Sequence, residues 1–252
     1  MFNGQTIVVT GAGRGIGAHI TRRLIDDEAQ VVLVGRSEEA LSATAHDLGE
    51  RASYYVADLG DRESLDRLIA WVHKSHPKLS GLINNAAIQT EMSLLSPKPE
   101  TLMAQMRTEI AVDLEAPLVL TGGLLGLLAK QPRSFVANIT SGLAFAPKEA
   151  SPAYCAAKAG LHSFTRTLRY QCQRGAPHIQ VSEAILPMVA TDMTAGRGRG
   201  KISAQEAACS ICDGIAAGKA EIWVGQAKML RILRHIAPPA ANRILRGEGV
   251  PS

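Results

Sequence analysis

The chain has 252 residues, of which 46% are hydrophobic and 20% are charged, and its formal net charge is +4. This length allows one or two domains, and a single α/β domain often reaches it. The aromatic content of 4% and the lack of a long basic run argue against a platform for nucleic acid, so no nucleic-acid partner is predicted.

Short apolar runs that are typical of strands alternate with amphipathic stretches that are typical of helices. The strands are predicted at 6–9, 31–34, 53–57, 81–84, 135–140, 179–185 and 221–224. The helices are predicted at 15–28, 38–48, 61–75, 100–128, 152–173 and 203–217. This alternation predicts an α/β fold over 1–252: a single doubly wound Rossmann-type domain, with a parallel sheet of about seven strands and helices on both faces.

A glycine-rich turn follows the first predicted strand, at Thr10-Gly11-Ala12-Gly13-Arg14-Gly15-Ile16-Gly17. Residues without a Cβ let the backbone tighten and approach a pyrophosphate, and the next helix offers free N–H groups to the anion. A dinucleotide site is therefore predicted, in preference to a tight turn without a ligand. Its candidate contacts are Gly11, Gly13, Arg14, Gly15, Ile16 and Gly17.

Two arginines stand near the expected adenosine end of this site. The second predicted strand ends in Val34-Gly35-Arg36-Ser37, without the carboxylate that would take the ribose hydroxyls of NAD. Arg14 and Arg36 suit a 2′-phosphate through charge-assisted hydrogen bonds. The sequence therefore favours NADP(H) over NAD(H), and the alternative is two solvated surface arginines.

Tyr154 and Lys158 are four residues apart in a predicted helix and so share one face. A hydride that reaches a carbonyl carbon leaves an oxygen that needs a proton, and an ammonium near a phenol is expected to lower the phenol pKa toward the working pH. Ser141 follows the fifth predicted strand, at the edge where parallel sheets bind ligands. These three residues are the catalytic candidates, against the alternative of a helix tyrosine beside a surface lysine.

Taken in order, these motifs resemble the short-chain dehydrogenase/reductase family. The motifs that support this resemblance are T-G-x-x-x-G-x-G at 10–17, Asn-Asn-Ala-Ala at 84–87 in place of N-N-A-G, and Y-x-x-x-K at 154–158. Thr-Ser-Gly-Leu-Ala-Phe at 140–145 resembles its DltE-like branch. The resemblance implies an NADP(H)-dependent oxidoreductase acting on a carbonyl/alcohol pair, with Ser141, Tyr154 and Lys158 as its catalytic triad.

The resemblance also implies further cofactor contacts. Asp58 is matched to an adenine contact, and Val189 and Thr191 to nicotinamide contacts, with Met188 in place of a glycine. The cofactor-binding positions implied in this way are Asp58, Leu59, Asn85, Ala86, Tyr154, Lys158, Pro187, Val189 and Thr191.

Asp113 stands where the family has an asparagine that holds a water beside the catalytic lysine. A carboxylate accepts hydrogen bonds there but donates none unless it is protonated, and it can pair with Lys158. Asp113 is thus a fourth catalytic candidate. If it keeps the role of the asparagine, Asp113→Asn is expected to preserve or raise turnover.

The basic, glycine-rich stretch Thr194–Lys201 falls where the family keeps a substrate lid, expected here over 194–217. Arg197 and Arg199 are candidates to meet an anionic substrate, although a solvated loop is favoured. The region 226–252 is expected to be a basic tail. The family resemblance further implies a homodimer or homotetramer paired through the helices at 100–128 and 152–173.

The four cysteines are too few for a disulfide-stapled secreted fold. Cys209 and Cys212 form an isolated C-x-x-C in a helical pattern, for which packing is favoured over metal or redox chemistry, and no metal is predicted. No signal peptide and no run near the roughly 18 apolar residues of a membrane span are expected. A cytoplasmic protein without a membrane partner is predicted.

Two other function classes remain open from the sequence. One is a dinucleotide-binding sensor with little turnover. Its support is that the chain departs from the family pattern at Ala87, Met188 and Asp113. Nucleic-acid binding through the basic tail would require strongly salt-dependent binding. The identity of the substrate does not follow from the sequence.

Overall fold

The computed structural model describes residues 2–95, 98–196 and 200–236. The main sheet is formed by β1 (Thr6–Thr10), β2 (Gln30–Gly35), β3 (Ala52–Val56), β4 (Leu79–Asn84), β5 (Ser134–Ser141), β6 (Ile179–Leu186) and β9 (Glu221–Trp223). The helices are α1 (Gly15–Asp26), α2 (Glu38–Leu48), α3 (Arg62–Ser75), α4 (Pro99–Ile110), α5 (Ala116–Leu128), α6 (Pro152–Gly175), α7 (Ala204–Ala216) and α8 (Ala227–Ile236). Shorter pieces are η1 (Ala111–Glu115), η2 (Gly142–Ala144), β7 (Val189–Ala190), η3 (Asp192–Thr194) and β8 (Ile202–Ser203).

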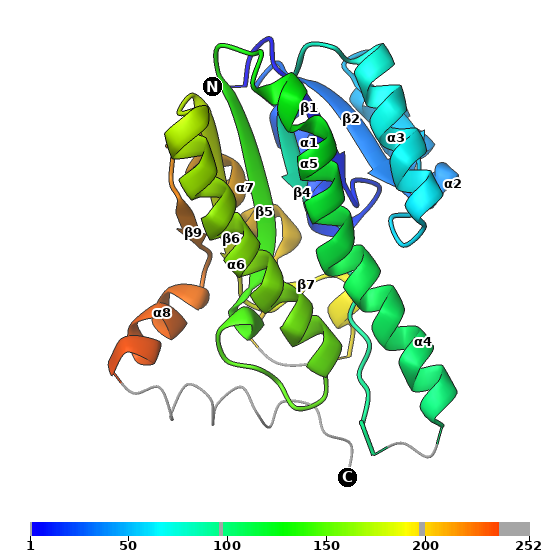
Figure 1. Ribbon diagram of the computed structural model, residues 1–252, viewed down its shortest axis with the longest axis vertical. Coiled ribbons are helices and arrows are strands. Elements are labelled where there is room, and N and C mark those ends of the chain that lie inside the picture. Colours follow the sequence, from blue (N-terminus) through cyan, green and yellow to red (C-terminus); the bar gives the residue numbers. More distant parts are fainter. Residues whose placement is uncertain (1, 96–97, 197–199, 237–252) are drawn as a thin grey trace.

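The seven main strands pair in the order β3-β2-β1-β4-β5-β6-β9, and every pairing is parallel. The strand order reverses direction between β1 and β4, which are neighbours in the sheet (Figure 1). Ligands of open α/β sheets bind in the crevice at the carboxyl ends of such strands. The predicted α/β architecture is therefore confirmed, and it points to the ends of β1 and β4 as the site.

Helices cover both faces of the sheet, each over its own apolar core. On one face Leu24 of α1 and Ile211 of α7 belong to a cluster of fully buried side chains. On the other face Leu68 of α3, Leu124 of α5 and Leu168 of α6 form the second cluster. Figure 1 shows α3, α5 and α6 lying across the near face of the sheet. Burial on both faces explains why the inner strands are continuous apolar runs.

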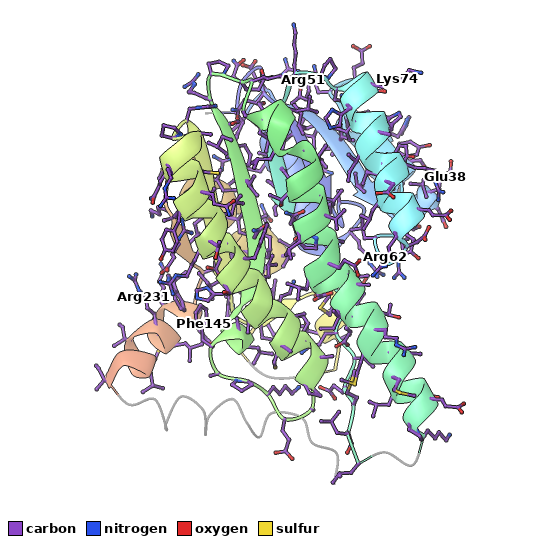
Figure 2. All side chains as sticks on the ribbon, viewed as in Figure 1. Glu38, Arg51, Arg62, Lys74, Phe145 and Arg231 are labelled. Carbon is purple, nitrogen blue, oxygen red and sulfur yellow. The ribbon has the colours of Figure 1, made fainter. Side chains whose placement is uncertain are left out.

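Charged side chains lie outside these cores. Glu38, Arg51 and Lys74 are exposed and project from the outer surface (Figure 2). Strand β3 is the exception to two-sided burial, because it pairs only with β2 at the sheet edge and exposes Tyr54 and Val56.

Capping residues account for where two of the helices begin. The Asp61 carboxylate accepts a hydrogen bond from the Ser64 backbone N–H at 3.1 Å and so caps α3. Ser203 and Glu206 form a capping box at the start of α7. Since α7 then packs into the core through Ile211 and Cys212, the part of 194–217 left for a lid is 194–203.

One helix has the length and mean hydropathy of a membrane span, although Asp113 and Glu115 interrupt its apolar sequence. The continuous helix over Pro99–Leu128 is long and apolar enough to cross a membrane by length and composition. In the fold its second half is a core helix, because Leu120 and Leu124 of α5 are buried against the sheet. A helix that packs on a sheet buried on both faces needs the same apolar composition as a spanning helix.

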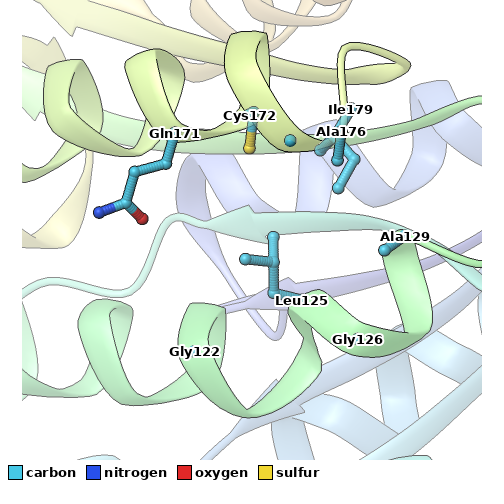
Figure 3. A pocket seen from close by; sticks show the side chains of 9 residues that line it. Gly122, Leu125, Gly126, Ala129, Gln171, Cys172, Ala176 and Ile179 are labelled. Atoms are coloured by element: carbon cyan, nitrogen blue, oxygen red, sulfur yellow. The ribbon is translucent and has the colours of Figure 1, made fainter.

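A shallow pocket of about 420 Å³ lies between α5 and α6 on the surface, remote from the carboxyl edge of the sheet. Figure 3 shows that small residues form its walls. Gly122 and Gly126 come from α5 and Ala176 follows α6, while Leu125, Ile179 and Gln171 are among the larger residues that line the pocket. The helix pair therefore presents a smooth, apolar surface.

Two features after residue 186 were not expected from the sequence. Strands β7 and β8 form a small parallel pair, with Val189 opposite Ile202. The segment after Gly225 continues as helix α8, where only a basic tail was predicted. Arg231 of α8 lies over the Trp223 ring at 5.9 Å from its centroid, close to the Phe145 side chain (Figure 2).

Candidate active site

The glycine turn lies at the carboxyl end of β1, where the strand order reverses. Gly11 and Gly15 have φ angles of +65° and +55°, in the left-handed region that favours glycine. A Cβ at Gly17 would lie 2.1 Å from the Gly11 carbonyl oxygen, so the turn can close only without a side chain there. The backbone thus leaves an open cradle at the N-terminus of α1, which fits a pyrophosphate.

Asn85 fastens this turn to the neighbouring strand. Its amide Nδ2 donates to the Thr10 carbonyl oxygen at 2.9 Å and reaches the Gly11 carbonyl oxygen at 3.3 Å. The Thr10 hydroxyl accepts from the backbone N–H groups of Asn85 and Ala86, each at 3.0 Å. Asn85 and Ala86, which the family resemblance implied as cofactor contacts, therefore lie against the cradle, and the structural task of Thr10 was not foreseen.

The three polar residues predicted at the adenosine end differ in their surroundings. Arg36 is exposed at the end of β2. Arg14 pairs with Asp192 at 3.7 Å, and both side chains are exposed. Asp58 is exposed after β3, and its Oδ1 accepts the Gly60 N–H at 2.9 Å, while Leu59 is buried.

The segment after β6 faces the glycine turn from the other side. The Thr191 Cγ2 would lie 3.4 Å from a Cβ added to Gly15, so these two residues nearly touch. Val189 is buried in β7, directly after Pro187 and Met188. The two predicted ends of the dinucleotide site are thus brought together across the crevice. Arg197 and Arg199 lie outside the described residues.

Ser141, Tyr154 and Lys158 meet at the carboxyl end of β5. The Ser141 hydroxyl hydrogen-bonds to the Tyr154 hydroxyl, and also accepts the Leu143 backbone N–H at 3.2 Å. The Lys158 Nζ lies 5.6 Å from the centroid of the Tyr154 ring and donates to the Ile139 carbonyl oxygen at 3.3 Å. The end of β5 and the first turns of α6 therefore bring these three residues together.

The expected effect of Lys158 on Tyr154 is not observed in this structure. Burial raises the pKa of the Tyr154 phenol, the Asp113 carboxylate raises it further, and the hydrogen bond from Ser141 opposes both. Burial is the largest cause, and the second is Asp113, whose Oδ2 is 3.4 Å from the Lys158 Nζ. The ammonium is paired with a carboxylate, so little of its charge is left to stabilise a phenolate.

Asp113 occupies the π-helical turn η1 between α4 and α5 and is fully buried. Its Oδ1 accepts the Ile88 backbone N–H at 2.8 Å. Burial raises the pKa of Asp113 to about 6, while Lys158 and the Ile88 N–H oppose the rise. Single π turns within α-helices often occur at functional sites, and this one turns the carboxylate toward Lys158.

Glu109 is a site residue that the sequence reasoning missed. It is fully buried one turn before Asp113, and its Oε1 accepts the Thr90 backbone N–H. Burial raises its pKa. The signal was present in the sequence, because Glu109 and Asp113 have the same four-residue spacing as Tyr154 and Lys158.

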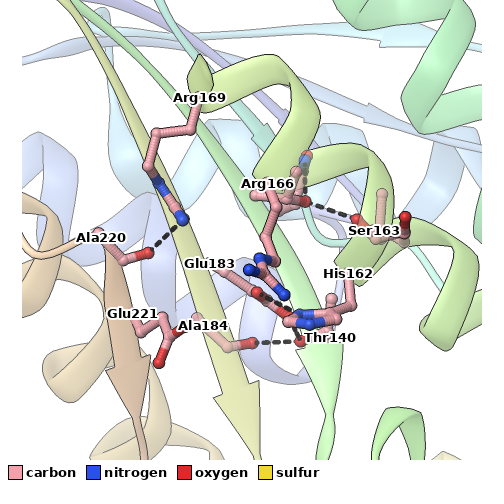
Figure 4. A network of polar contacts seen from close by, with 12 residues as sticks. Thr140, His162, Ser163, Arg166, Arg169, Glu183, Ala184, Ala220 and Glu221 are labelled. Atoms are coloured by element: carbon pink, nitrogen blue, oxygen red, sulfur yellow. Dashed lines mark hydrogen bonds and ion pairs between the residues drawn. The ribbon is translucent and has the colours of Figure 1, made fainter. Parts of the chain in front are cut away.

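A second buried polar network lies beyond Lys158 on α6 (Figure 4). The His162 Nδ1 lies 2.8 Å from Oε2 of the fully buried Glu183, whose Oε1 accepts from the Thr140 hydroxyl at 2.7 Å. The His162 ring contacts Phe145 edge-on, with 4.5 Å between the centroids. The network thus anchors both sides of Ser141, since Thr140 precedes it and Phe145 follows η2.

The cysteines show no ligand geometry among the described residues. Cys212 is buried in the core beside α1, where burial raises its pKa to about 12, and Cys209 is half-buried. No three His, Cys, Asp or Glu side chains are grouped for a metal ion within 2–95, 98–196 and 200–236.

Residues 5–201 match the family described as "short chain dehydrogenase". The chain is 34% identical to the uncharacterized oxidoreductase DltE of Bacillus subtilis over 234 residues, which are 90% of each chain. It is also similar in structure to a short chain dehydrogenase from Burkholderia cenocepacia in complex with NADP, with a TM-score of 0.84, 23% identity and coverage of 97% and 98% of the two chains. A short chain dehydrogenase/reductase from Burkholderia phymatum in complex with NAD gives a TM-score of 0.82 at 20% identity, over 100% and 98% of the chains.

Proposed function

Because the chain belongs to the short-chain dehydrogenase family, in its DltE-like branch, we propose that it transfers hydride between NADP(H) and a carbonyl/alcohol substrate with Tyr154 as general acid/base. It is an NAD(P)-dependent short-chain oxidoreductase by family. The observation that carries the proposal is the grouping of Ser141 and the buried Lys158 around Tyr154: the Lys158 Nζ is 5.6 Å from the centroid of the Tyr154 ring, and Ser141 lowers the pKa of the phenol.

The proposed mechanism assigns one task to each residue. Nicotinamide supplies or accepts the hydride when it is bound. The Ser141 hydroxyl orients the substrate oxygen, and Tyr154 gives that oxygen a proton in reduction or takes one in oxidation. Lys158 holds positive charge beneath the phenol and would bind the ribose hydroxyls. Asp113 takes the place of the family asparagine and sets how much of that charge reaches Tyr154.

The cradle fits a dinucleotide. The turn from Gly11 to Gly17 would bind the pyrophosphate through backbone N–H groups, and Thr191 faces this turn at Gly15. The remaining proposed contacts are Asp58, Leu59, Asn85 and Ala86 on the adenosine side, and Tyr154, Lys158, Pro187 and Val189 on the nicotinamide side.

The preference for NADP(H) is proposed from Arg14 and Arg36, because an exposed guanidinium matches a phosphate dianion and no carboxylate ends β2. Related solved structures are described with NADP and with NAD.

Replacement Arg36→Asp should lower kcat/KM for NADPH by roughly tenfold to a hundredfold and leave NADH less affected. Steady-state kinetics with both cofactors measures this, and Arg51→Asp, distant on the surface, is the matched control. An unchanged NADPH/NADH ratio contradicts the preference.

Turnover is the decisive test of the enzyme proposal. Oxidation of NADPH should be seen with members of a panel of ketones and aldehydes, and Tyr154→Phe should lower kcat by roughly a hundredfold or more, because the proton donor is removed and the fold is kept. Tyr170→Phe, at an exposed position of the same helix, is the control. If wild-type protein binds NADPH but turns over no substrate, the dinucleotide-sensor alternative is favoured instead.

We infer a cytoplasmic homodimer or homotetramer that pairs through α5 and α6. The smooth surface around Gly122, Gly126 and Ala176 supports close approach of a second copy (Figure 3). Small-molecule substrates are typical of the family. We also propose that the region 194–217 contains the substrate lid that the family resemblance implies.

A further inference from the structure

Glu109 is a buried carboxylate that the proposed mechanism does not use. It lies in the last turns of α4 and is fully buried, and its Oε1 accepts the backbone N–H of Thr90. Its Oε2 has no hydrogen-bond partner among the described residues. A buried carboxylate with an unpaired oxygen is costly when charged, so such a group tends to hold a proton.

Asp113 has the same arrangement one helical turn later. Its Oδ1 accepts the Ile88 N–H, and its Oδ2, which faces Lys158 at 3.4 Å, makes no hydrogen bond in the described part of the chain. The two carboxylates therefore accept hydrogen bonds from the backbone N–H groups of Ile88 and Thr90, two residues apart in the segment that follows β4. The charge of Glu109 also helps to raise the pKa of Asp113.

The charges around the pair do not balance two negative carboxylates. Lys158 is the ammonium that pairs with Asp113, and Lys148 pairs with Glu91 at 2.7 Å. The titratable and charged groups that face the pair from α4, η1, α6 and the adjoining loops are Glu109, Asp113, Tyr154, Cys155, Lys158, Lys148 and Glu91. One nearby ammonium is thus available to two carboxylates.

We propose that Glu109 is a positioning residue that forms with Asp113 a buried acid pair, and that this pair holds one proton whose release controls the charge felt by the Tyr154 hydroxyl. The proposal rests on the proposed function for its effect on turnover. The acid pair itself is a property of the folded chain and needs no substrate.

The coupling to Tyr154 follows from the signs of the charges. Both Asp113 and Glu109 raise the pKa of Tyr154 when they are ionised. When the pair takes up a proton, Asp113 no longer neutralises Lys158, and the ammonium then favours the phenolate. Loss of that proton makes Tyr154 a weaker acid, so the phenol keeps its proton more firmly at higher pH.

Glu109 also lies near the first turn of the helix that carries Tyr154. The backbone N–H of Tyr154 lies in the first turn of α6 and acts on the Glu109 carboxylate, lowering its pKa. Negative charge is favourable at a helix N-terminus. Glu109 therefore joins three parts of the site: the segment at residue 90, the turn at Asp113 and the start of α6.

Infrared spectroscopy of the folded wild-type protein, without cofactor or substrate, tests the pair directly. The absorption of a protonated, buried carboxyl group should titrate with a midpoint near pH 6 or above, because the pKa of Asp113 is about 6. In Glu109→Gln the midpoint should fall by at least about half a unit, since one negative charge is removed beside Asp113. In Asp113→Asn a band that belongs to Glu109 should remain, and the double variant should have none.

Glu115→Gln is the matched control, because Glu115 lies on the same long helix but pairs at the surface with Arg62 at 2.9 Å. It should leave the titration unchanged. An unmoved midpoint in Glu109→Gln, or no band that titrates above about pH 5 in wild-type protein, would overturn the acid pair. If Glu109→Gln does not fold, the Asp113→Asn spectrum decides, because a Glu109 band is either present or absent.

The pH profile of kcat in the alcohol-oxidation direction then tests the link to Tyr154. Its acid-side ionisation should move to lower pH in Glu109→Gln by about the same half unit, a change that a merely structural role would not produce. If the infrared band titrates as expected but the pH profile of kcat does not shift in Glu109→Gln, the proposed coupling of the acid pair to Tyr154 is contradicted. Titration as expected in a protein that reduces no carbonyl compound would refute the proposed function and leave the acid pair standing.

Discussion

A carboxylate at position 113 changes the electrostatics of an otherwise familiar arrangement. An asparagine would leave the Lys158 charge free, whereas Asp113 lies 3.4 Å from the Lys158 Nζ in full burial. The ion pair offsets part of the cost of burying two charges, but burial still disfavours the charged carboxylate. Asp113 is therefore expected to tune Tyr154 at some cost to the stability of the fold.

That cost predicts how stability depends on pH. The pKa of Asp113 is raised from 3.8 to about 6 on folding, so between these values the folded chain holds a proton that the unfolded chain has released. The stabilising contribution of the proton on Asp113 is therefore fully present below about pH 4, and it is lost as the pH rises through about 6. The free energy of unfolding of wild-type protein should fall by on the order of 2 kcal/mol over this interval relative to Asp113→Asn.

Urea denaturation at about pH 4.5 and pH 7.5 measures this difference. Asp66→Asn, at an exposed position of α3, is the control and should retain the wild-type dependence. If wild-type protein and Asp113→Asn lose stability in parallel between the two pH values, the buried carboxylate is not the titrating group.

At the scale of elements, α5 and α6 each have a buried face in the core and an outer face at the surface. Their inner faces carry Leu124 and Leu168 into the core, and their outer faces form the shallow pocket of small residues (Figure 3). Small residues on a helix surface let a second helix approach closely, as large side chains would not. The outer surface of these two helices is thus the proposed contact between copies.

Gly126 gives a direct test of that contact. A Cβ at Gly126 would meet nothing within 4 Å, so Gly126→Arg should leave the single chain folded and even favour α5 by up to about 1 kcal/mol. In a paired assembly the same side chain would clash, and the molar mass in solution should fall to that of one chain. Size-exclusion chromatography with light scattering measures this. Gly126→Ala, which adds one methyl group, should keep the assembly. An oligomer that persists in Gly126→Arg rules out this surface.

At the scale of the molecule, the strand order explains why residues distant in the sequence act together. The glycine turn follows β1, Asn85 follows β4, Ser141 ends β5 and β6 leads to Thr191. In a parallel sheet all their carboxyl ends lie on one edge. Packing at the same scale joins segments from the two ends of the chain, because α7 lies against α1 in one core, with Arg23 of α1 and Asp213 of α7 paired at 3.3 Å.

The sequence alone predicted the layers of the fold and the main candidates of the site. The strand and helix periods are local patterns, so the alternation identified all seven strands of the main sheet and the helices between them, to within a few residues. Gly11, Gly17 and Tyr154 could be proposed for a similar reason, since a glycine-rich turn and a four-residue helical spacing are both local patterns, whereas Ser141 was proposed from its place after the fifth predicted strand. Helix α8 and the β7–β8 pair were not predicted, because each is short and depends on contacts with distant segments.

Only the tertiary structure decided the charge state of the site. The sequence suggested that Lys158 would lower the pKa of Tyr154, yet that pKa is raised, because burial and Asp113 outweigh the ammonium. Glu109 had no assigned role until the fold placed it, fully buried, against residue 90 and the start of α6. A pKa depends on desolvation and on every charge within a few ångströms, and these quantities are set by how segments pack and not by spacing along the chain.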